Sequence, residues 1–337
     1  MIVDYFERTK VDEEFYNEFI KDRIPKKIID MHIHISDVEM RKNCVADPTD
    51  WSNQCNSIMR FQDYEFYRDA FYPDSEVEAN VLPCVTRGLD VVANNNYLSD
   101  LKKSGKARYA HMMVDPTWDV EFTEKMLVEG EFTGFKPYPD FVSGVQGAEI
   151  GLLDFIRPDQ LALANKYKKS IVLHLPRVGR FPDDNNIKEI RYIKDKFPDI
   201  KLIIAHVGRC YSIDWIVRAT EKLGDDRNYF HYDLAALINP VVLDYVFEHY
   251  PLDQIMYGTD LPIFLWHGKR QWTDVKYINM PREDFPFNKH IEGPEAEAKY
   301  TFFVYEQLKS ILDATYKVGG RKFAEDIFYN NAVKFLG

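Results

Sequence analysis

Short apolar runs alternate along this chain of 337 residues with longer segments in which apolar positions recur at helical spacing. The first run, Ile-Ile-Asp-Met-His-Ile-His at residues 28–34, is rich in β-branched residues and predicts a buried strand. Seven further runs predict strands, at residues 80–86, 108–114, 132–136, 170–175, 201–206, 229–234 and 254–258. Helical periodicity predicts helices between them, at residues 88–103, 119–129, 157–168, 185–196, 212–223 and 239–249.

Eight strands that alternate with helices indicate an α/β protein with a (β/α)8 TIM barrel. The alternative is a doubly wound open sheet, but no strand is followed by the glycine-rich phosphate turn typical of that fold. We expect one domain over residues 1–337, with an N-terminal helix at 12–24 and extra helices at 291–336. The long polar and aromatic loop after the first strand, residues 36–78, is interpreted as a lid or pocket wall, or else as a surface subdomain or dimer contact.

Composition narrows the functional classes. Apolar residues make up 45% of the chain and charged residues 29%, which is typical of a folded globular protein, and the net charge of −11 argues against a nucleic-acid partner. The sequence has no apolar run long enough to cross a membrane and no secretion signal, so we expect no membrane partner and a cytoplasmic location. The four cysteines have no C-x-x-C spacing and predict no disulfide framework, although Cys44 and Cys55 would pair if the fold brought them together.

Histidines and carboxylates follow several of the predicted strands. His32 and His34 lie two residues apart, so they point to the same side of their strand, and Asp30 is predicted to share that side. His174, His206 and Asp260 end later strands, and in a barrel the carboxyl ends of all strands meet at one face. Histidines that only satisfy backbone groups are the alternative, but several together predict a shared metal site.

Neutral imidazoles with one carboxylate suit Zn²⁺ best, and also Mn²⁺ or Fe²⁺. An open coordination position would let such an ion activate water near neutral pH. Asp260 could bind the ion, act as a base, or do both at different stages.

The order of these residues, with Lys136 at the end of the fourth strand, resembles the amidohydrolase superfamily. The runs Tyr-Gly-Thr-Asp-Leu-Pro at 257–262 and Ile-Phe-Tyr-Asn-Asn-Ala-Val-Lys-Phe-Leu at 327–336 are similar to the closing motifs of its amidohydrolase-2 branch. That branch includes aminocarboxymuconate-semialdehyde decarboxylase and related decarboxylases, lactonases and hydrolases. The resemblance covers residues 28–336 and is specific for fold and metal dependence, not for substrate.

The resemblance implies roles for individual residues. The expected ligands of a single ion are His32, His34, His174 and Asp260. His206 would lie beside the metal as a base or polarising group. In relatives with two ions, Lys136 would be carboxylated to bridge them and His206 would bind the second. Pro137 departs from the usual Leu-His or Ile-His after that lysine, so we expect one ion. Lys136 would then hold a substrate carboxylate or be an ion-paired structural lysine. The resemblance also implies a homo-oligomer, most simply a dimer.

Two arginines follow the later histidines by three residues. Arg177 comes after His174 and Arg209 after His206, and the guanidinium fork matches a carboxylate. They predict a small-molecule substrate that carries a carboxylate, with Arg180 as a further candidate. The alternative is that these arginines cap helices or pair with nearby aspartates at 183, 184 and 214.

Three functions remain open. The first is a metal-dependent hydrolase of an amide, ester or lactone that acts through a metal-activated water, with Asp260 and His206 as catalytic residues that move protons. The second is a metal-dependent nonoxidative decarboxylase of an aromatic or unsaturated carboxylate, which the aromatic residues at 51–72 slightly favour. The third is a metal-free barrel used for binding. Weaker site candidates are His111, Asp115, Asp233 and His267.

Overall fold

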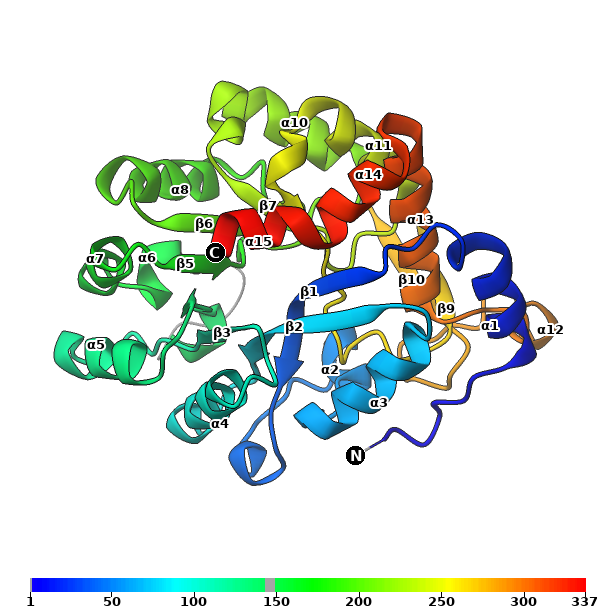
Figure 1. Ribbon diagram of the computed structural model, residues 1–337, viewed down its shortest axis with the longest axis horizontal. Helices are drawn as coiled ribbons and strands as arrows, with labels where there is room; N and C mark the ends of the chain where they lie inside the picture. The colour runs from blue at the N-terminus through cyan, green and yellow to red at the C-terminus, as the bar shows by residue number, and fades with distance from the viewer. Residues whose placement is uncertain (1, 143–148) are drawn as a thin grey trace.

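In a computed structural model that describes residues 2–142 and 149–337, eight parallel strands form one barrel (Figure 1). The strands pair in chain order from the first to the eighth. They are β1 Lys27–Ile35, β2 Glu76–Pro83, β3 Tyr109–Met112, β4 Gly134–Phe135, β5 Ser170–Leu173, β6 Lys201–Ile204, β7 His231–Asp233 and β8 Ile255–Met256. The barrel closes because Met31 N–H donates to Tyr257 O (3.0 Å) and His34 N–H donates to Leu261 O (2.8 Å). The predicted (β/α)8 barrel is confirmed.

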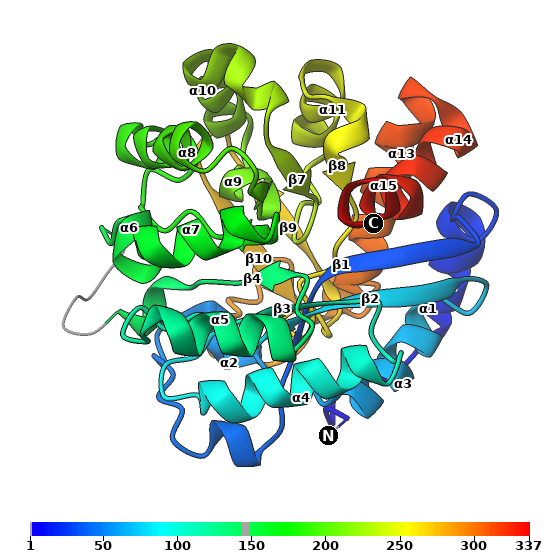
Figure 2. The ribbon, with the colours of Figure 1, turned by 60° about the vertical axis from the view of Figure 1, so that its left-hand side comes forward.

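Helices cover the outside of the barrel (Figures 1 and 2). Those after the first and last strands are α3 Phe61–Phe71 and α13 Phe303–Val318, and those between are α4 Val91–Lys103, α5 Val120–Glu129, α7 Pro158–Lys166, α8 Asp184–Lys196, α10 Ile213–Leu223 and α11 Pro240–His249. Aspartate side chains cap several of their N-termini; Asp183, for example, accepts from the backbone of Asn185 and Asn186 at the start of α8. The predicted helices are therefore present, with ends that differ by up to three residues.

Shorter elements complete the chain. The α-helices are α1 Lys10–Phe15, α2 Trp51–Cys55, α6 Leu152–Phe155, α9 His206–Arg209, α12 Pro294–Glu297, α14 Gly320–Glu325 and α15 Asn331–Leu336; the 3-10 and π turns are η1 Tyr16–Ile20, η2 Glu39–Arg41, η3 Pro139–Phe141, η4 Gly224–Asn228, η5 Leu252–Gln254 and η6 Asp326–Asn330. The predicted N-terminal helix is thus α1 with its π turn. After β8 the chain adds an antiparallel hairpin, β9 Gly268–Trp272 and β10 Tyr277–Pro281, which sequence periodicity did not indicate.

The first strand carries a bulge that decides which residues face the barrel interior. Its register with β2 shifts between Asp30 and Ile33. Ile29 and Met31 pack inside with apolar residues of β5, β6 and β8. His32 also faces the interior, next to Asp233 of β7 and to residues that follow β4, β6 and β8. Because the bulge shifts the alternation by one residue, Asp30 points to the other side. The prediction that Asp30 shares a side with the two histidines is wrong.

Most aromatic residues of the loop at 36–78 belong to the core. Phe61, Tyr64, Tyr67 and Phe71 on α3 are 0–3% exposed and pack in the main hydrophobic cluster. They anchor α3 between the barrel and the C-terminal helices, where Phe71 packs edge-on against Phe302 with ring centroids 5.0 Å apart. The buried aromatics therefore stabilise the fold and do not form a lid over the site.

Among the described residues, no helix is long and apolar enough to span a membrane.

Candidate metal centre

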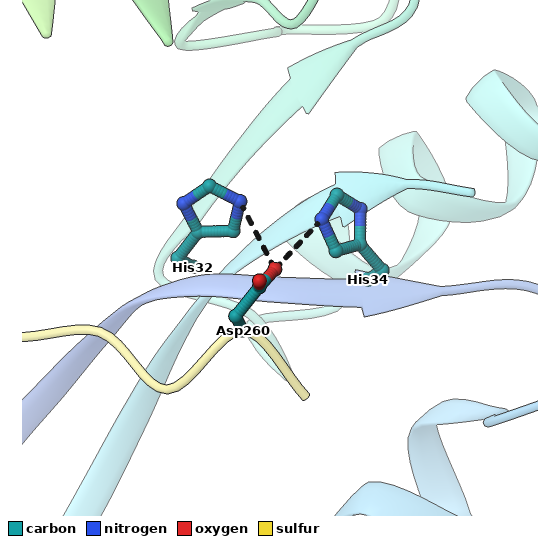
Figure 3. A group of neighbouring side chains, drawn as sticks. All are labelled: His32, His34 and Asp260. Atoms are coloured by element: carbon teal, nitrogen blue, oxygen red, sulfur yellow. Dashed lines mark ion pairs between the residues drawn. The ribbon is translucent and has the colours of Figure 1, made fainter. Parts of the chain in front are cut away.

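His32 and His34 each use one ring nitrogen to fix the ring and direct the other toward the interior. His32 Nδ1 donates to Asp233 Oδ2 at 2.9 Å, and His34 Nδ1 donates to the backbone carbonyl of Pro83 at 2.7 Å. The two Nε2 atoms then face Asp260 Oδ1, at 3.6 Å from His32 and 3.4 Å from His34 (Figure 3). Anchoring of Nδ1 by a carboxylate or carbonyl is how proteins orient metal-binding histidines.

Asp260 is held in place by the residues on either side of it. Asp30 accepts from Thr259 Oγ1 at 2.6 Å and from Thr259 N at 3.0 Å, while Asp260 N–H donates to His32 O at 2.8 Å. Gly258 lets this segment approach β1 closely, because a Cβ there would lie 2.9 Å from His32 Cβ. Burial opposes ionisation of Asp260, but His206 and His34 lower its pKa to about 2, so it is a carboxylate at neutral pH.

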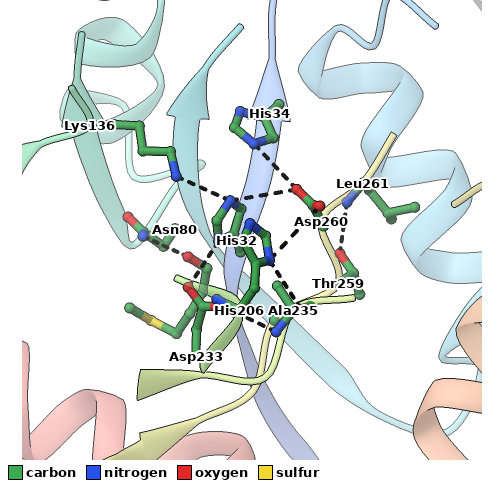
Figure 4. A network of polar contacts seen from close by, with 12 residues as sticks. His32, His34, Asn80, Lys136, His206, Asp233, Ala235, Thr259, Asp260 and Leu261 are labelled. Carbon is green, nitrogen blue, oxygen red and sulfur yellow. Dashed lines mark hydrogen bonds and ion pairs between the residues drawn. The ribbon is translucent and has the colours of Figure 1, made fainter. Parts of the chain in front are cut away.

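His206 and Asp233 connect β6 and β7 to the same cluster. Asp233 accepts from His206 N at 2.8 Å through Oδ1 and from His32 through Oδ2. The His206 ring donates from Nδ1 to Ala235 O at 3.1 Å, and this nitrogen lies 4.0 Å from Asp260 Oδ2 (Figure 4). Asp233 therefore orients two histidines at once. The sequence predicted this strand at residues 229–234 and gave Asp233 as a weaker site candidate.

Lys136 lies inside the cluster with its side chain fully buried. Its Nζ is 3.4 Å from His32 Nε2 (Figure 4). Burial lowers the pKa of Lys136 to about 8, against the opposing effect of Asp233 and Asp260. With this pKa Lys136 is still mostly protonated at neutral pH, but it loses its proton far more easily than an exposed lysine.

His174 borders the cluster from the end of β5. Its ring centroid lies 5.5 Å from that of His206 and 5.0 Å from that of Tyr138. Two groups of three residues have ligand atoms within 4.8 Å of one another, His32–His34–Asp260 and His32–His206–Asp233, and His174 belongs to neither. His174 therefore lines the same pocket but lies outside these two groups of ligand atoms.

Burial keeps His32, His174 and His206 neutral. Desolvation lowers the pKa of His32, His174 and His206, for the first two well below the usual value of 6.5. Neutral imidazoles together with the ionised Asp260 are the protonation states that a divalent ion needs in its ligands. The donor set of the cluster therefore fits a metal ion such as Zn²⁺ or Mn²⁺.

Several residues next to these side chains adopt the left-handed backbone region. His206, Val207 and Arg209 have φ of 56°, 46° and 64°, and Asp260 has φ of 69°. For a β-branched residue such as Val207 this conformation is strained, at about 1–3 kcal/mol. Strain of this kind persists where surrounding contacts hold it, here the Asp233 bond to His206 N, and it concentrates at functional sites.

The cluster lines an open pocket. The loop after β1 supplies one polar wall, with Arg41, Asp50, Ser52, Asn53 and Asn56. Aromatic side chains also line the pocket, namely Tyr138, Tyr211, Tyr277 and Trp51. Part of residues 36–78 is thus a pocket wall, as the loop's length suggested.

The two arginines predicted to bind substrate have different surroundings. Arg177 forms a two-pronged ion pair with Glu189 (2.9 and 3.2 Å) and does not line the pocket. Arg209 lines the pocket, donates to the carbonyls of Leu175 and Pro176, and forms no ion pair with any residue that the structure describes. Of the two predicted arginines, Arg209 alone has a guanidinium placed for a ligand in this pocket, whereas Arg177 joins the β5 loop to α8.

Arg180 packs beside the pocket without lining it. Its guanidinium stacks on Trp215 at 4.0 Å and donates to Arg209 O. On the hairpin, Arg270 is buried behind Tyr211 and Tyr277, 4.9 and 4.5 Å from their ring centroids. Sequence reasoning missed Tyr277 and Arg270, because nothing in the strand pattern indicates that this hairpin folds back over the barrel.

The other histidines are satisfied elsewhere. His111 in the barrel interior bonds Asn80 Oδ1 at 2.8 Å and Ser170 Oγ at 2.7 Å. His267, a weaker candidate for the pocket, is buried between Asp12 and Glu283. Asp115 binds its own turn through Thr117. None of the three lines the pocket.

Comparisons with known proteins agree with this architecture. The sequence model of the Amidohydro_2 family, described as amidohydrolase, matches residues 29–337. No curated protein sequence matches the chain. Among solved structures, IDCase of Metarhizium anisopliae is similar with a TM-score of 0.59 at 13% identity, over 92% of this chain and 97% of that one.

Two further structures share the fold. The 5-carboxyvanillate decarboxylase of Novosphingobium aromaticivorans, solved with manganese and 4-hydroxy-3-methoxy-5-nitrobenzoic acid, has a TM-score of 0.57 at 12% identity, over 92% of this chain and 95% of that one. Amidohydrolase 2 of Bifidobacterium longum subsp. infantis has a TM-score of 0.54 at 13% identity, over 93% and 99%. Since the family match runs from the first strand of the barrel to its last helix, the chain belongs to the amidohydrolase family and is an enzyme of that superfamily.

Proposed function

We propose that this enzyme is a metal-dependent hydrolase of a small carboxylate-bearing substrate with an amide, ester or lactone bond. The observation that carries the proposal is the pair of anchored histidines, whose Nε2 atoms face the Asp260 carboxylate at the floor of an open pocket. When bound there, one divalent ion would supply Lewis-acid polarisation of water and of a substrate oxygen. We expect Zn²⁺, with His32, His34, His174 and Asp260 as its ligands.

Residues of the chain itself would transfer protons, bind the substrate and retain water in the pocket. Asp260 is ionised and His206 is neutral, so either can accept a proton at the pocket floor and return it to a leaving group. Arg209 would hold the substrate carboxylate, since no described residue forms an ion pair with it. The polar wall formed by the β1 loop would keep water in the pocket, which hydrolysis needs.

Nonoxidative decarboxylation of an aromatic or unsaturated carboxylate is the second candidate. The aromatic wall of Tyr138, Tyr211 and Tyr277 favours it, because flat substrates stack on such rings. Its support from residues 51–72 is smaller than the sequence suggested, since most of those rings lie in the core and Trp51 alone of the aromatics at 51–72 lines the pocket. Here His206 or Asp260 would protonate the carbon that loses carbon dioxide.

One experiment separates these functions. The protein is purified without chelator, its metal content is measured, and it is incubated with lactones, N-acyl amino acids and hydroxybenzoates in heavy-oxygen water and, separately, in deuterium oxide. Heavy oxygen in the product indicates hydrolysis, and deuterium on carbon with released carbon dioxide indicates decarboxylation. About one ion per chain supports the single-ion site, and about two would assign Lys136 and His206 to a second ion. Less than about a tenth of an ion, with no activation by Zn²⁺ or Mn²⁺, would contradict metal dependence.

A further inference from the structure

Two free thiols meet at the edge of the pocket. Cys84 follows β2 directly and lines the pocket, and Cys44 belongs to the loop after β1. Both approach Thr86, Cys84 Sγ at 3.5 Å from its Oγ1 and Cys44 Sγ at 3.8 Å from its carbonyl oxygen. The two side chains pack in the same small apolar cluster, close enough for each thiol to shift the pKa of the other. Cys44 thus meets Cys84 and not Cys55, which donates to Ile263 O.

Backbone contacts on both sides hold the Cys44 loop against the segment after β2. Val45 N–H donates to Arg87 O at 2.9 Å, and Asp90 N–H donates to Met40 O at 2.9 Å. Gly88, with φ of 86°, lets the two backbones touch, because a Cβ there would lie 2.1 Å from Asn43 O. The fold therefore sets the position of Cys44 beside the segment that carries Cys84. The two sulfurs would have to approach to about 2 Å, the length of an S–S bond, for a disulfide to form.

The surroundings favour reaction at Cys84. The hydrogen bond from Cys44 lowers the pKa of the Cys84 thiol, and the guanidinium of Arg41 acts in the same direction. Cys84 is 4% exposed, but it lines the pocket, so a small molecule that enters the pocket reaches it. A thiolate that is stabilised by a cation and accessible to small molecules is the form that oxidants attack.

We propose that Cys44 and Cys84 form a redox modification site, a dithiol that hydrogen peroxide converts to an intramolecular disulfide. The Cys84 thiolate attacks one peroxide oxygen; an S–O bond forms, the O–O bond breaks, and the leaving hydroxide takes a proton to become water. The Cys44 thiol then attacks the Cys84 sulfur; the S–S bond forms, the S–O bond breaks, and a second water leaves with the thiol proton. Two thiols are oxidised by two electrons and one peroxide is reduced.

The disulfide would restrain one wall of the pocket. It would link the loop that carries Arg41 and Asp50 to the end of β2, one residue beyond Pro83, whose carbonyl anchors His34. A dithiol reductant would release it. The inference does not depend on the reaction proposed above, because it concerns only these thiols and the loop.

The test is a peptide mass map of the full chain after treatment with hydrogen peroxide and alkylation of the remaining thiols. We expect a peptide that links Cys44 to Cys84, alkylated Cys55 and Cys210, and reversal by dithiothreitol. Cys44→Ser should abolish the linked peptide, whereas the matched control Cys55→Ser should retain it. Amide hydrogen exchange at residues 37–50 should slow in the oxidised protein.

Other outcomes would overturn the inference. In the first, Cys44 and Cys84 are both still alkylated after peroxide treatment that oxidises glutathione in the same tube. In the second, the disulfide links two copies of the chain. In the third, Cys84 is over-oxidised while Cys44 remains a free thiol. Unchanged exchange at residues 37–50 would refute the restraint of the pocket wall. The peptide mass map of the unsubstituted protein tests for the disulfide even if a variant fails to fold.

Discussion

Two buried clusters in this protein combine histidine with carboxylates, and they serve different ends. In the pocket, His32 and His34 meet Asp260, with Asp233 behind them (Figure 4). Away from it, His267 is held between Asp12, 3.1 Å from Nε2, and Glu283, 2.9 Å from Nδ1. Asp12 also accepts from Thr301 Oγ1 and Phe302 N, so this second cluster joins the N-terminal helix α1 to the segment before α13.

The difference lies in which ring nitrogens are already bonded. Both nitrogens of His267 have carboxylate partners within the fold, and these hydrogen bonds outweigh desolvation and raise its pKa. His32 and His34 are anchored through Nδ1, their Nε2 atoms face Asp260 at 3.6 and 3.4 Å, and burial lowers the pKa of His32. A cluster of histidine and carboxylate is therefore a structural ion pair when both ring nitrogens bond carboxylates inside the fold, and a candidate ligand set when one nitrogen of each ring faces a pocket.

Removing a pocket carboxylate should have the largest effect. Asp260→Ala should reduce bound metal from about one ion per chain to less than about a tenth, because the variant loses the carboxylate that faces both Nε2 atoms. Elemental analysis of the purified variant measures this. The matched change in the other cluster, Glu283→Ala, should leave the metal content of the folded protein unchanged. Equal metal loss in the two variants would contradict the difference between a ligand set and a structural ion pair.

His206→Ala should separate catalysis from metal binding. We expect turnover of whichever substrate the isotope experiment identifies to fall about 10²–10⁴-fold, as for loss of a general base, while most of the single ion stays bound. Kinetics and elemental analysis on the same preparation are the measurements. If the purified variant contains no metal, His206 is a metal ligand.

His267→Ala should chiefly affect stability. It would leave Asp12 and Glu283 buried without their cation, which costs about 3–5 kcal/mol in the free energy of unfolding. Urea unfolding measures this, with His249→Ala as control, since that partly buried histidine bonds only a carbonyl of its own helix. A loss below about 1 kcal/mol would mean that the second cluster contributes little to the fold.

Asp233→Asn should weaken metal binding without abolishing it. Asp233 orients His32 and fixes the backbone of His206, and loss of such a partner typically costs about 10–100-fold in metal affinity. Titration of the variant against a competing chelator measures this change in metal affinity. Asp115→Asn, at the end of β3 and away from the pocket, is the control and should leave affinity unchanged.

The smallest effect should appear as a pH dependence of the second cluster. Because the fold raises the pKa of His267 above 6.5, its contribution to stability is complete below that pH and is lost as pH rises through the raised pKa. The stability difference between the wild type and His267→Gln, from urea unfolding at several pH values, should narrow on the alkaline side. A difference that widens there would contradict the charged state of His267.

Much of the fold could be predicted from periodicity. The eight strands, the helices between them and the residues at the strand ends followed from apolar runs and from the rule that barrel strands present their carboxyl ends at one face. The strand limits were less accurate: β2 begins at Glu76, not 80, and β4 spans only Gly134–Phe135. Strand pairing depends on neighbours that are distant in sequence, and no local window contains them.

The sequence by itself determined the barrel, the positions of His32, His34, His206 and Asp260 at one face, and the membership of Lys136 in their cluster. Tertiary structure alone decided that a bulge in β1 turns Asp30 away, that Arg177 belongs to Glu189 while Arg209 faces the pocket, and that Cys44 meets Cys84. The physical reason is the same in each case. Alternation and strand order are local properties of the chain, whereas the partner of a side chain depends on which other segments the closed barrel brings beside it.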